Sequence, residues 1–422
     1  MKLTLKNTPE QVELIKAMGS RQQTVAREAQ EAFAAFLGPV VQQVLNQAGT
    51  AGSIYTDAPY DEDDSPSYPL DLYYNDGVNT VSVWSQNIAG GLPASAVEGM
   101  AELKIATYRL DSAVSFLKKY ARRGRLDVIS KGVERMAQEV LVKQERNAWA
   151  VVLKALGEAT SSGVTSGIGV ASLKAGSHVV PVTDESVFQL ADLNRLMTLN
   201  KRINESFANG TPDNVYSTGV TDLYVSPEIK EQIRAFAYQP MNTRHGKVTT
   251  SGATAVPLPD SVRTDIYNAA GASEIYGVNI VELNELGTGK KYNQLFDQFD
   301  SGNIAPNGTN TAHAFSEADD ELCVGIDNSK GAFIRALAQN ADSGASFTAE
   351  PDDQYVQRAE KLGFYGSLEE GRVCIDGRAI VGLLVLSLIH ISEPTRPERI
   401  GGGGVCGEKK RGGGGGGGGG GG

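Results

Sequence analysis

The chain has 422 residues, which is enough for two or three folded domains or for one elongated domain. Its formal net charge is −11 at pH 7, and its 41% hydrophobic residues are ordinary for a folded soluble protein. No apolar run reaches the ~18–20 residues of a membrane span, and the start MKLTLKNTPE lacks the apolar stretch of a secretion signal. The acidic balance argues against a nucleic-acid-binding surface as a whole, although a basic inner face stays open.

Residues 8–47 are expected to be helical. Thr8 and the following Pro-Glu-Gln have the form of a capping box with Pro at the first helical position. Two apolar stripes follow, and the Gly-Pro pair at 38–39 is expected to kink or divide the segment. Such an amphipathic arm can pack on another subunit or on its own domain, and both alternatives stay open.

The next part of the chain is expected to be extended. A stretch rich in Gly, Pro, Ser and Asp predicts a loop, and the Asp-Gly pair at 76–77 predicts a hairpin. In residues 102–120 the alternation of apolar side chains changes phase, which predicts a long strand with a bulge near Thr107. Residues 52–120 are therefore predicted to form an extended β excursion. Because it has little core of its own, this excursion must pack on another surface.

Charge is unevenly distributed along this part of the chain. From Glu28 through Leu103 there are eleven acidic residues and no Lys or Arg, whereas from Lys104 to Arg146 there are eleven basic and five acidic residues. One interpretation is a solvated acidic loop. The other is that the acidic excursion of one copy rests on the basic segment of another. The residues that would form this contact are Asp61, Glu62, Asp63, Asp64, Arg122, Arg123 and Arg125.

The segment around which the chain is organised runs from Arg125 to Gly157 and predicts one long helix. Its apolar residues recur with the spacing of a single buried stripe: Leu126, Ile129, Val133, Met136, Val140, Ala148, Val151 and Ala155. Charged residues, Glu145 among them, fill the other faces. Asp127 is expected to cap the start, Gly157 to end the helix, and Gly132 to cost about 1 kcal/mol near its beginning. At ~1.5 Å per residue the helix is ~45 Å long and needs a flat surface along its stripe.

The second half of the chain mixes helices and strands. Helices are expected at 186–207, 227–238 and 258–270, and a short strand at 222–226 leads directly into the second of them. Further strands are expected at 274–283, 322–327, 332–337, 354–368 and 371–385, with loops at 160–177 and 300–316. No internal repeat is found.

The end of the chain is expected to lie outside the fold. From about Leu386 it reads LSLIHISEPTRPERIGGGGVCGEKKR followed by glycines, which resembles a translated sequencing adapter followed by poly-G. A flexible Gly-rich tail is the alternative. Residues 387–422, with His390 and Cys406, are therefore left out of the search for a site.

No metal site is predicted. His178, His245 and His313 have no partner at ligand spacing. Cys323 and Cys374 fit no metal or redox spacing, which favours a reducing compartment. The four consecutive carboxylates that begin at Asp61 lack the alternating spacing of a calcium loop.

No catalytic or cofactor site is predicted either. The Gly-Thr-Gly-Lys run at 287–290 is superficially similar to a phosphate loop, but Asn284 stands at the first Gly and Lys291 at the Ser or Thr. There is no G-x-S-x-G elbow and no Cys–His pair. Trp84 and Trp149 fit packing roles.

The order of these parts resembles the major capsid protein of tailed bacteriophages, whose Hong Kong-type fold is shared with encapsulin shells and the herpesvirus capsid floor. The stretches that resemble the family are YRLDSAVSFLKKYARRGRLDVISKGVERMAQEVLVKQERNAWAVVLKAL, LYVSPEIKEQIRAFAY and EKLGFYGSLEEGRVCIDGRAIVG. The resemblance implies an α+β fold with an N-terminal helical arm at 1–50, an extended β loop at 51–120, a spine helix and peripheral domain at 121–220, an axial domain at 221–352, and return strands of the peripheral domain at 353–386.

The resemblance implies a non-enzymatic protein that assembles with itself into the hexamers and pentamers of an icosahedral shell around double-stranded DNA. It implies no cofactor and no membrane. The implied partners are scaffold and cement proteins and DNA held non-specifically on the inner face, and the implied location is the virion, after assembly in the host cytoplasm. The alternatives are an encapsulin-like compartment shell and an enzyme that brings His245 together with distant Asp and Ser residues. Some relatives crosslink the β loop through a lysine, but this chain has no Lys from residue 17 to 103.

Overall fold

The computed structural model describes residues 8–47, 49–62, 64–69, 102–159, 178–182, 187–203, 219–235, 264, 274–299, 315–340, 346–352 and 360–386. The chain divides into two units, residues 1–387 and 388–422, and every described residue belongs to the first. The predicted adapter-like tail, the hairpin at 76–77 and Trp84 lie outside the described residues. So do the loops predicted at 160–177 and 300–316, except for 315 and 316, and the helix predicted at 258–270, except for Thr264.

The first sheet has five strands. They are β1 (Thr56–Asp61), β4 (Thr107–Leu117), β10 (Phe333–Gln339), β11 (Phe347–Asp352) and β12 (Lys361–Cys374). The long strand β12 pairs with β4 along one side and with β11 and then β10 along the other. All of these pairings are antiparallel, and β1 then adds to β10 in parallel. As a result, β1 and β4 lie at opposite edges of the sheet.

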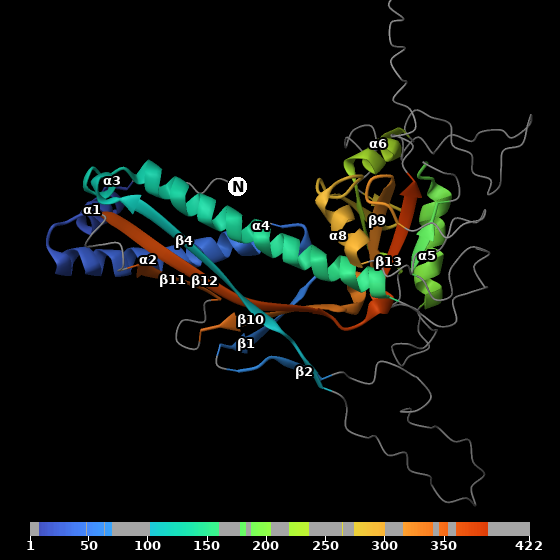
Figure 1. The fold of residues 1–422 in the computed structure, drawn as a ribbon, viewed down its shortest axis with the longest axis horizontal. Helices are drawn as coiled ribbons and strands as arrows, with labels where there is room; N and C mark the ends of the chain where they lie inside the picture. The colour runs from blue at the N-terminus through green and yellow to red at the C-terminus, as the bar shows by residue number, and fades with distance from the viewer. Residues whose placement is uncertain are drawn as a thin grey trace, which may run out of the picture. The chain divides into compact units, whose positions relative to one another are not determined.

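The predicted β excursion is therefore anchored at both ends in a sheet of its own chain (Figure 1). The single strand expected at 102–120 is β3 (Glu102–Lys104) followed by β4 and then the short helix α3 (Lys118–Arg122). β3 pairs with β2 (Ser67–Pro69) instead of entering the five-stranded sheet. The change of phase near Thr107 thus marks the point at which the chain passes from one sheet to another.

The second sheet has six strands in the order β5-β13-β9-β6-β8-β7. They are β5 (Val179–Pro181), β6 (Asp222–Val225), β7 (Glu274–Ile275), β8 (Val278–Glu282), β9 (Asp320–Ile326) and β13 (Ile380–Leu386). The pairs β5–β13 and β6–β8 are parallel, and the others are antiparallel. Around it lie α5 (Leu190–Ile203), α6 (Pro227–Ala235) and α8 (Lys291–Phe299), together with the 3-10 turns η1 (Ala51–Ser53), η3 (Asn328–Lys330) and η5 (Gly377–Ala379).

Both sheets draw strands from several of the predicted domain ranges. β10 and β11 come from the range 221–352 but pair with β12, which belongs to 353–386. Conversely, β13 of that last range pairs with β9 and with β5. The fold class is α+β, as predicted, but the chain crosses repeatedly between the two sheets.

Several predicted elements of the second half are confirmed, and several are wrong. The helices at 186–207 and 227–238 and the strand at 222–226 are present as α5, α6 and β6. The strand expected at 274–283 is the hairpin β7–β8, because its chain reverses at Tyr276 and Gly277. The strands expected at 354–368 and 371–385 are divided differently, as β12 and β13. The elements β5, β11 and α8 were not predicted.

The N-terminal segment forms α1 (Pro9–Met18) and α2 (Gln23–Gln47), with Thr8 as an extended N-cap that makes no side-chain cap hydrogen bond. The break lies at Gly19 and not at the Gly-Pro pair, through which α2 continues. A side chain at Gly19 would place its Cβ 2.7 Å from the backbone nitrogen of Arg122, so the close approach of α3 requires glycine there. In this copy the helices pack on their own chain, since Ile15 and Phe33 join the core of the first sheet.

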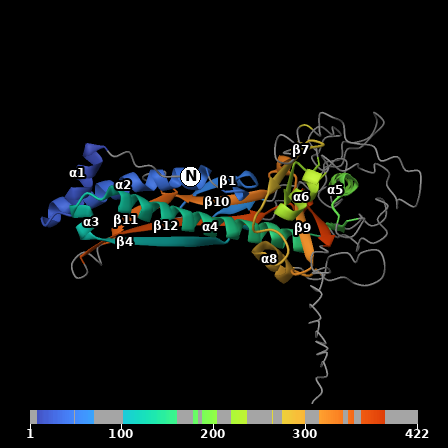
Figure 2. The same cartoon turned by 90° about the horizontal axis from the view of Figure 1, so that it is seen from above.

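The predicted long helix is α4 (Leu126–Glu158), confirmed to within one residue at each end. It lies along β4 and β12 and continues to α8 and β13 (Figures 1 and 2). Arg125 is the last residue before α4 with a non-helical backbone, and it is therefore the N-cap. The cap predicted at Asp127 is wrong. The stop predicted at Gly157 comes one residue too early, because the backbone becomes extended only at Ala159. Gly132 sits where β4 crosses, and a Cβ there would lie 3.2 Å from Val114 Cγ1.

The buried face of α4 changes between its two halves. Its first half buries Ile129 and Val133 in the core of the first sheet, as the stripe predicted. Its second half buries Trp149, Val152 and Leu153 in another core, whereas the predicted positions Val151 and Ala155 are only half-buried. A straight stripe fails here because the helix meets a different sheet along its second half.

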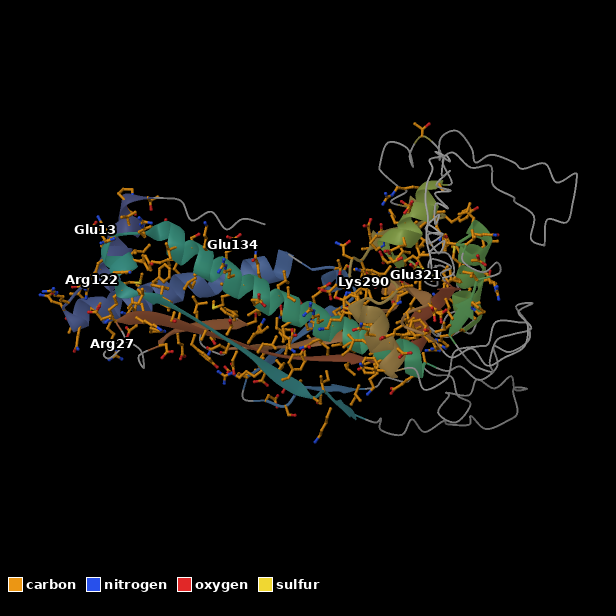
Figure 3. The ribbon with its side chains drawn as sticks, turned by 45° about the horizontal axis from the view of Figure 1, so that its top comes forward. Glu13, Arg27, Arg122, Glu134, Lys290 and Glu321 are labelled. Atoms are coloured by element: carbon orange, nitrogen blue, oxygen red, sulfur yellow. The ribbon has the colours of Figure 1, made fainter. Side chains whose placement is uncertain are left out.

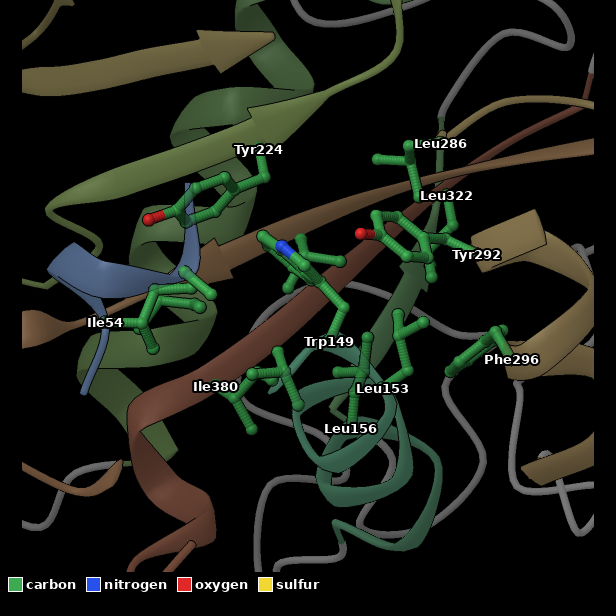
Figure 4. Close-up of a cluster of buried hydrophobic side chains, with 14 of the residues drawn as sticks. Ile54, Trp149, Leu153, Leu156, Tyr224, Leu286, Tyr292, Phe296, Leu322 and Ile380 are labelled. Atoms are coloured by element: carbon green, nitrogen blue, oxygen red, sulfur yellow. The ribbon is translucent and has the colours of Figure 1, made fainter. Parts of the chain in front are cut away.

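Trp149 fills the centre of that second core (Figure 4). Its ring packs edge-on against Tyr224, with centroids 4.9 Å apart. The ring of Tyr292 lies at 5.6 Å and is tilted by 30° from the plane of the Trp149 ring. The packing role predicted for Trp149 is confirmed, since the residue is fully buried.

Candidate assembly surface

The acidic candidates lie where the edge strand β1 ends. Asp61, Glu62 and Asp64 are all exposed, and Asp63 is outside the described residues. The backbone N–H of Glu62 donates to the carbonyl of Gln339 at 3.3 Å, and that of Asp64 to the carbonyl of Asp61 at 2.9 Å. These contacts hold the backbone while the three carboxylates stay in solvent, and none of them forms an ion pair with another described residue.

The basic candidates lie at the opposite edge, in and just after α3. Arg122, Arg123 and Arg125 are exposed, and none is in an ion pair within the part of the chain that the structure describes. Arg122 Nε donates to the carbonyl of Gly19 at 2.9 Å, next to α1 (Figure 3). Gly124, at φ 64°, makes the left-handed turn into α4. This turn leaves Arg123 and Arg125 with guanidinium groups that can meet another molecule.

The structure does not bring the acidic and basic candidates together within one copy. The acidic group follows β1 and the arginines follow β4, which are opposite edges of the same sheet. A contact between them would therefore join two copies, and it stays a prediction.

A buried ion pair that the sequence reasoning missed holds the first sheet to α4. Glu370 and Arg372 are 3.1 Å apart, with side chains 0% and 4% exposed. Tyr108 donates its hydroxyl to Glu370 Oε1 at 2.6 Å, and Gln144 donates from α4 to Oε2 at 3.1 Å. The guanidinium of Arg372 lies 4.8 Å from the centre of the Tyr55 ring. Burial raises the pKa of Tyr55 and the pKa of Tyr108 above the ordinary value of a tyrosine. Glu370 is thus the common acceptor that joins β12, β4 and α4.

Glu145 fixes the chain where it leaves the N-terminal helices, although the sequence placed it on a solvent face. Its Oε1 accepts from the backbone N–H groups of Thr50 at 2.9 Å and Ala51 at 3.0 Å, and from Trp149 Nε1 at 3.2 Å. The hydroxyl of Thr50 also contacts this oxygen. A signal was present, since Glu145 lies one helical turn before the buried Trp149.

We expect Glu145→Ala to destabilise the subunit by about 1–3 kcal/mol, because four donors lose a common acceptor. Denaturant unfolding monitored by tryptophan fluorescence measures the change. Glu139→Ala, an exposed site on the same helix, is the control and should shift stability by less than about 0.5 kcal/mol. Equal effects of the two variants would contradict the role assigned to Glu145.

The phosphate-like run at 287–290 lies beside carboxylates, which does not suit an anion. A Cβ added to Gly287 would lie 3.2 Å from Glu228 Oε2. Nearby, Glu321 is buried and accepts from Ser226 Oγ at 3.1 Å (Figure 3 labels Lys290 and Glu321). Burial and the neighbouring Glu228 raise the pKa of Glu321 to about 7. This corner of the second sheet therefore favours a proton over a phosphate.

The sequence also predicted no metal site and showed no apolar run long enough for a membrane span. His178 is buried, with Nδ1 2.9 Å from the carbonyl of Ile380, while His245 and His313 lie outside the described residues. Among the residues described, no cluster of His, Cys, Asp and Glu could hold a metal ion. Within those same ranges, no helix is long and apolar enough to cross a membrane.

No family model and no curated protein matches the chain. Solved structures with a similar fold include the capsid of the cyanophage P-SCSP1u, at 15% identity over 81% of this chain and 89% of that chain, with a TM-score of 0.48. The capsid of a native GTA particle is 12% identical over 80% of this chain and 91% of that chain, at a TM-score of 0.46. The SrpI encapsulin of Synechococcus elongatus PCC 7942 is 9% identical over 80% of this chain and 86% of that chain, at 0.38. The fold of this chain is similar to that of phage capsid and encapsulin shells.

Proposed function

We propose that this chain is the major capsid protein of a tailed phage, a structural protein that assembles into an icosahedral shell around double-stranded DNA. The observation that carries the proposal is the placement of unpaired charge at opposite edges of one sheet: acidic after β1 and basic after β4. Joining such edges makes a heterologous, head-to-tail contact, and contacts of this kind form rings when the rotation between neighbouring copies closes. Hexamers and pentamers are the rings from which a closed shell is built.

The proposal extends to the setting of the assembled protein. It places the chain in the virion after assembly in the host cytoplasm, without a catalytic role. Scaffold and cement proteins are proposed as separate partners. Packaged DNA would meet the inner face without sequence specificity, through phosphate contacts that weaken as salt rises.

The charge contact makes a direct prediction about assembly. Reversing Arg122 and Arg123 to Glu should block assembly, because the acidic group of the next copy then meets like charge. The subunit should stay folded by circular dichroism, since neither arginine is in an ion pair with a described residue and Arg122→Glu removes a single hydrogen bond, from Nε to the carbonyl of Gly19. Arg135→Glu, at an exposed site on α4 that is likewise in no ion pair with a described residue, is the matched control and should leave assembly unchanged. Normal shells from the double variant would refute this contact.

The proposed function is tested by expressing the full chain and examining it by velocity sedimentation and negative-stain electron microscopy. Hexamers, pentamers or closed shells are expected, if necessary after co-expression with the neighbouring reading frames that would encode scaffold. The particle diameter separates a phage head from an encapsulin-like compartment. A chain that stays monomeric under both conditions would overturn the proposal.

A further inference from the structure

The hairpin β7–β8 reverses through only two residues. Glu274 is opposite Asn279 and Ile275 is opposite Val278, which leaves Tyr276 and Gly277 as the turn. Their φ angles are 55° and 79°. Positive φ at both central residues is the geometry of a type I′ turn, which strongly favours Asn, Asp or Gly at the first position.

The backbone conformation at Tyr276 is therefore less favourable for Tyr than it would be for Asn. A bulky side chain at positive φ is an outlier, and such strain persists where it serves another purpose. The positive φ of Gly277 favours glycine at that position. A Cβ added to Gly277 would meet nothing within 4 Å. Among the residues that the structure describes, nothing lies against this side of the turn that would force the conformation on the tyrosine.

The Tyr276 ring adds little stability to its own subunit to offset this strain. It is 57% exposed, more than any other large apolar side chain in the described ranges. By contrast, Ile275 beside it is buried in the core of the second sheet. The side chain that stabilises this hairpin is Ile275, and Tyr276 is directed away from that core.

The position of the tip suits contact with another molecule. β7 is the last strand of the second sheet on this side, among the strands described. Two nearby carboxylates are already engaged, since Asn279 donates to Asp222 Oδ1 at 3.0 Å and Arg234 lies 4.0 Å from Glu282. The exposed Glu274 lies two positions before the ring, so the tip combines an aromatic ring with one exposed carboxylate. Aromatic rings are enriched among the anchors of protein interfaces.

We propose that Tyr276 is an assembly anchor that inserts into an apolar site on a second copy of this chain. The proposal rests on the proposed function, which supplies the second copy. It explains why a strained, exposed tyrosine occupies a turn that a small polar residue would fit better. The anchor is separate from the charged contact, which involves the edges of the other sheet.

The test compares Tyr276→Asn and Tyr276→Phe in the full chain. Tyr276→Asn relieves the turn and removes the ring, so the thermal midpoint of the subunit should rise while the concentration needed for assembly increases at least tenfold. Tyr276→Phe keeps the ring and should assemble close to wild type. Val187→Asn, at another exposed apolar residue, is the control and should leave assembly unchanged.

The outcomes separate the two proposals. If wild type assembles and Tyr276→Asn assembles at the same concentration, the anchor is refuted and the proposed function stands. The same holds if Val187→Asn weakens assembly as much as Tyr276→Asn does. If wild type forms no rings or shells under any condition of the preceding test, the proposed function fails and the anchor fails with it.

Discussion

Glu370→Ala is expected to destabilise the subunit by about 3–5 kcal/mol, because it leaves the buried guanidinium of Arg372 without its carboxylate. Arg372 is only 4% exposed, so water cannot replace the lost partner fully. The same substitution removes the acceptor of Tyr108 and Gln144. A loss of this size is a large fraction of the about 5–15 kcal/mol that stabilises a typical domain. The measurement is chemical denaturation with circular dichroism.

The adjacent Glu369 provides the control. It points to the other face of β12, where Tyr60 donates to it at 3.1 Å, and Glu369→Ala should cost about 1 kcal/mol. A second variant isolates the charge: Glu370→Leu combined with Arg372→Leu removes both ions and should recover much of the loss. If Glu370→Ala were no worse than Glu369→Ala, the buried pair would not be the point that joins the sheet to α4.

The long helix could be predicted because its signal is local. A stripe with the spacing of one helix face, continued over 33 residues, fixes both the type of element and its approximate ends. The β7–β8 hairpin could not be predicted, because a Tyr-Gly turn lacks the Asn-Gly or Asp-Gly signal by which such turns are recognised. The segment EIYGVNIVEL was therefore interpreted as one strand.

The buried ion pair escaped prediction for a different reason. Glu370 is separated by 226 residues from Gln144 and by 262 from Tyr108, and no short pattern announces partners that distant. For the candidate surface, the sequence indicated seven charged residues, and six of them are exposed in the structure, while Asp63 lies outside the described residues. It could not indicate that they lie at opposite edges of one sheet, because the order of strands depends on pairings between distant segments.

Glu321→Gln is expected to stabilise the subunit above pH 7 and to remove part of its pH dependence. The folded-state pKa of Glu321 is raised from 4.5 to about 7, first by burial and then by Glu228. The unfolded chain releases this proton near pH 4.5, so the stability from the protonated group is fully present below that pH. It is lost as pH rises from 4.5 through 7. A shift of this size corresponds to about 3 kcal/mol of stability that wild type lacks at pH 8.

Glutamine stays neutral at every pH, and its amide can donate where Glu321 Oε1 and Glu228 Oε2 are buried without a hydrogen-bond partner among the described residues. Thermal unfolding between pH 5 and 8 should therefore show the variant close to wild type at the acid end and more stable at the alkaline end. Glu228→Gln should move the wild-type transition to lower pH, because it removes the neighbouring charge that helps raise the pKa of Glu321. Glu231→Gln, exposed on the same helix, should change neither. If the slope of stability against pH were unaltered in Glu321→Gln, the proton would reside elsewhere, and the Glu321–Glu228 pair would carry no charge cost in the folded chain.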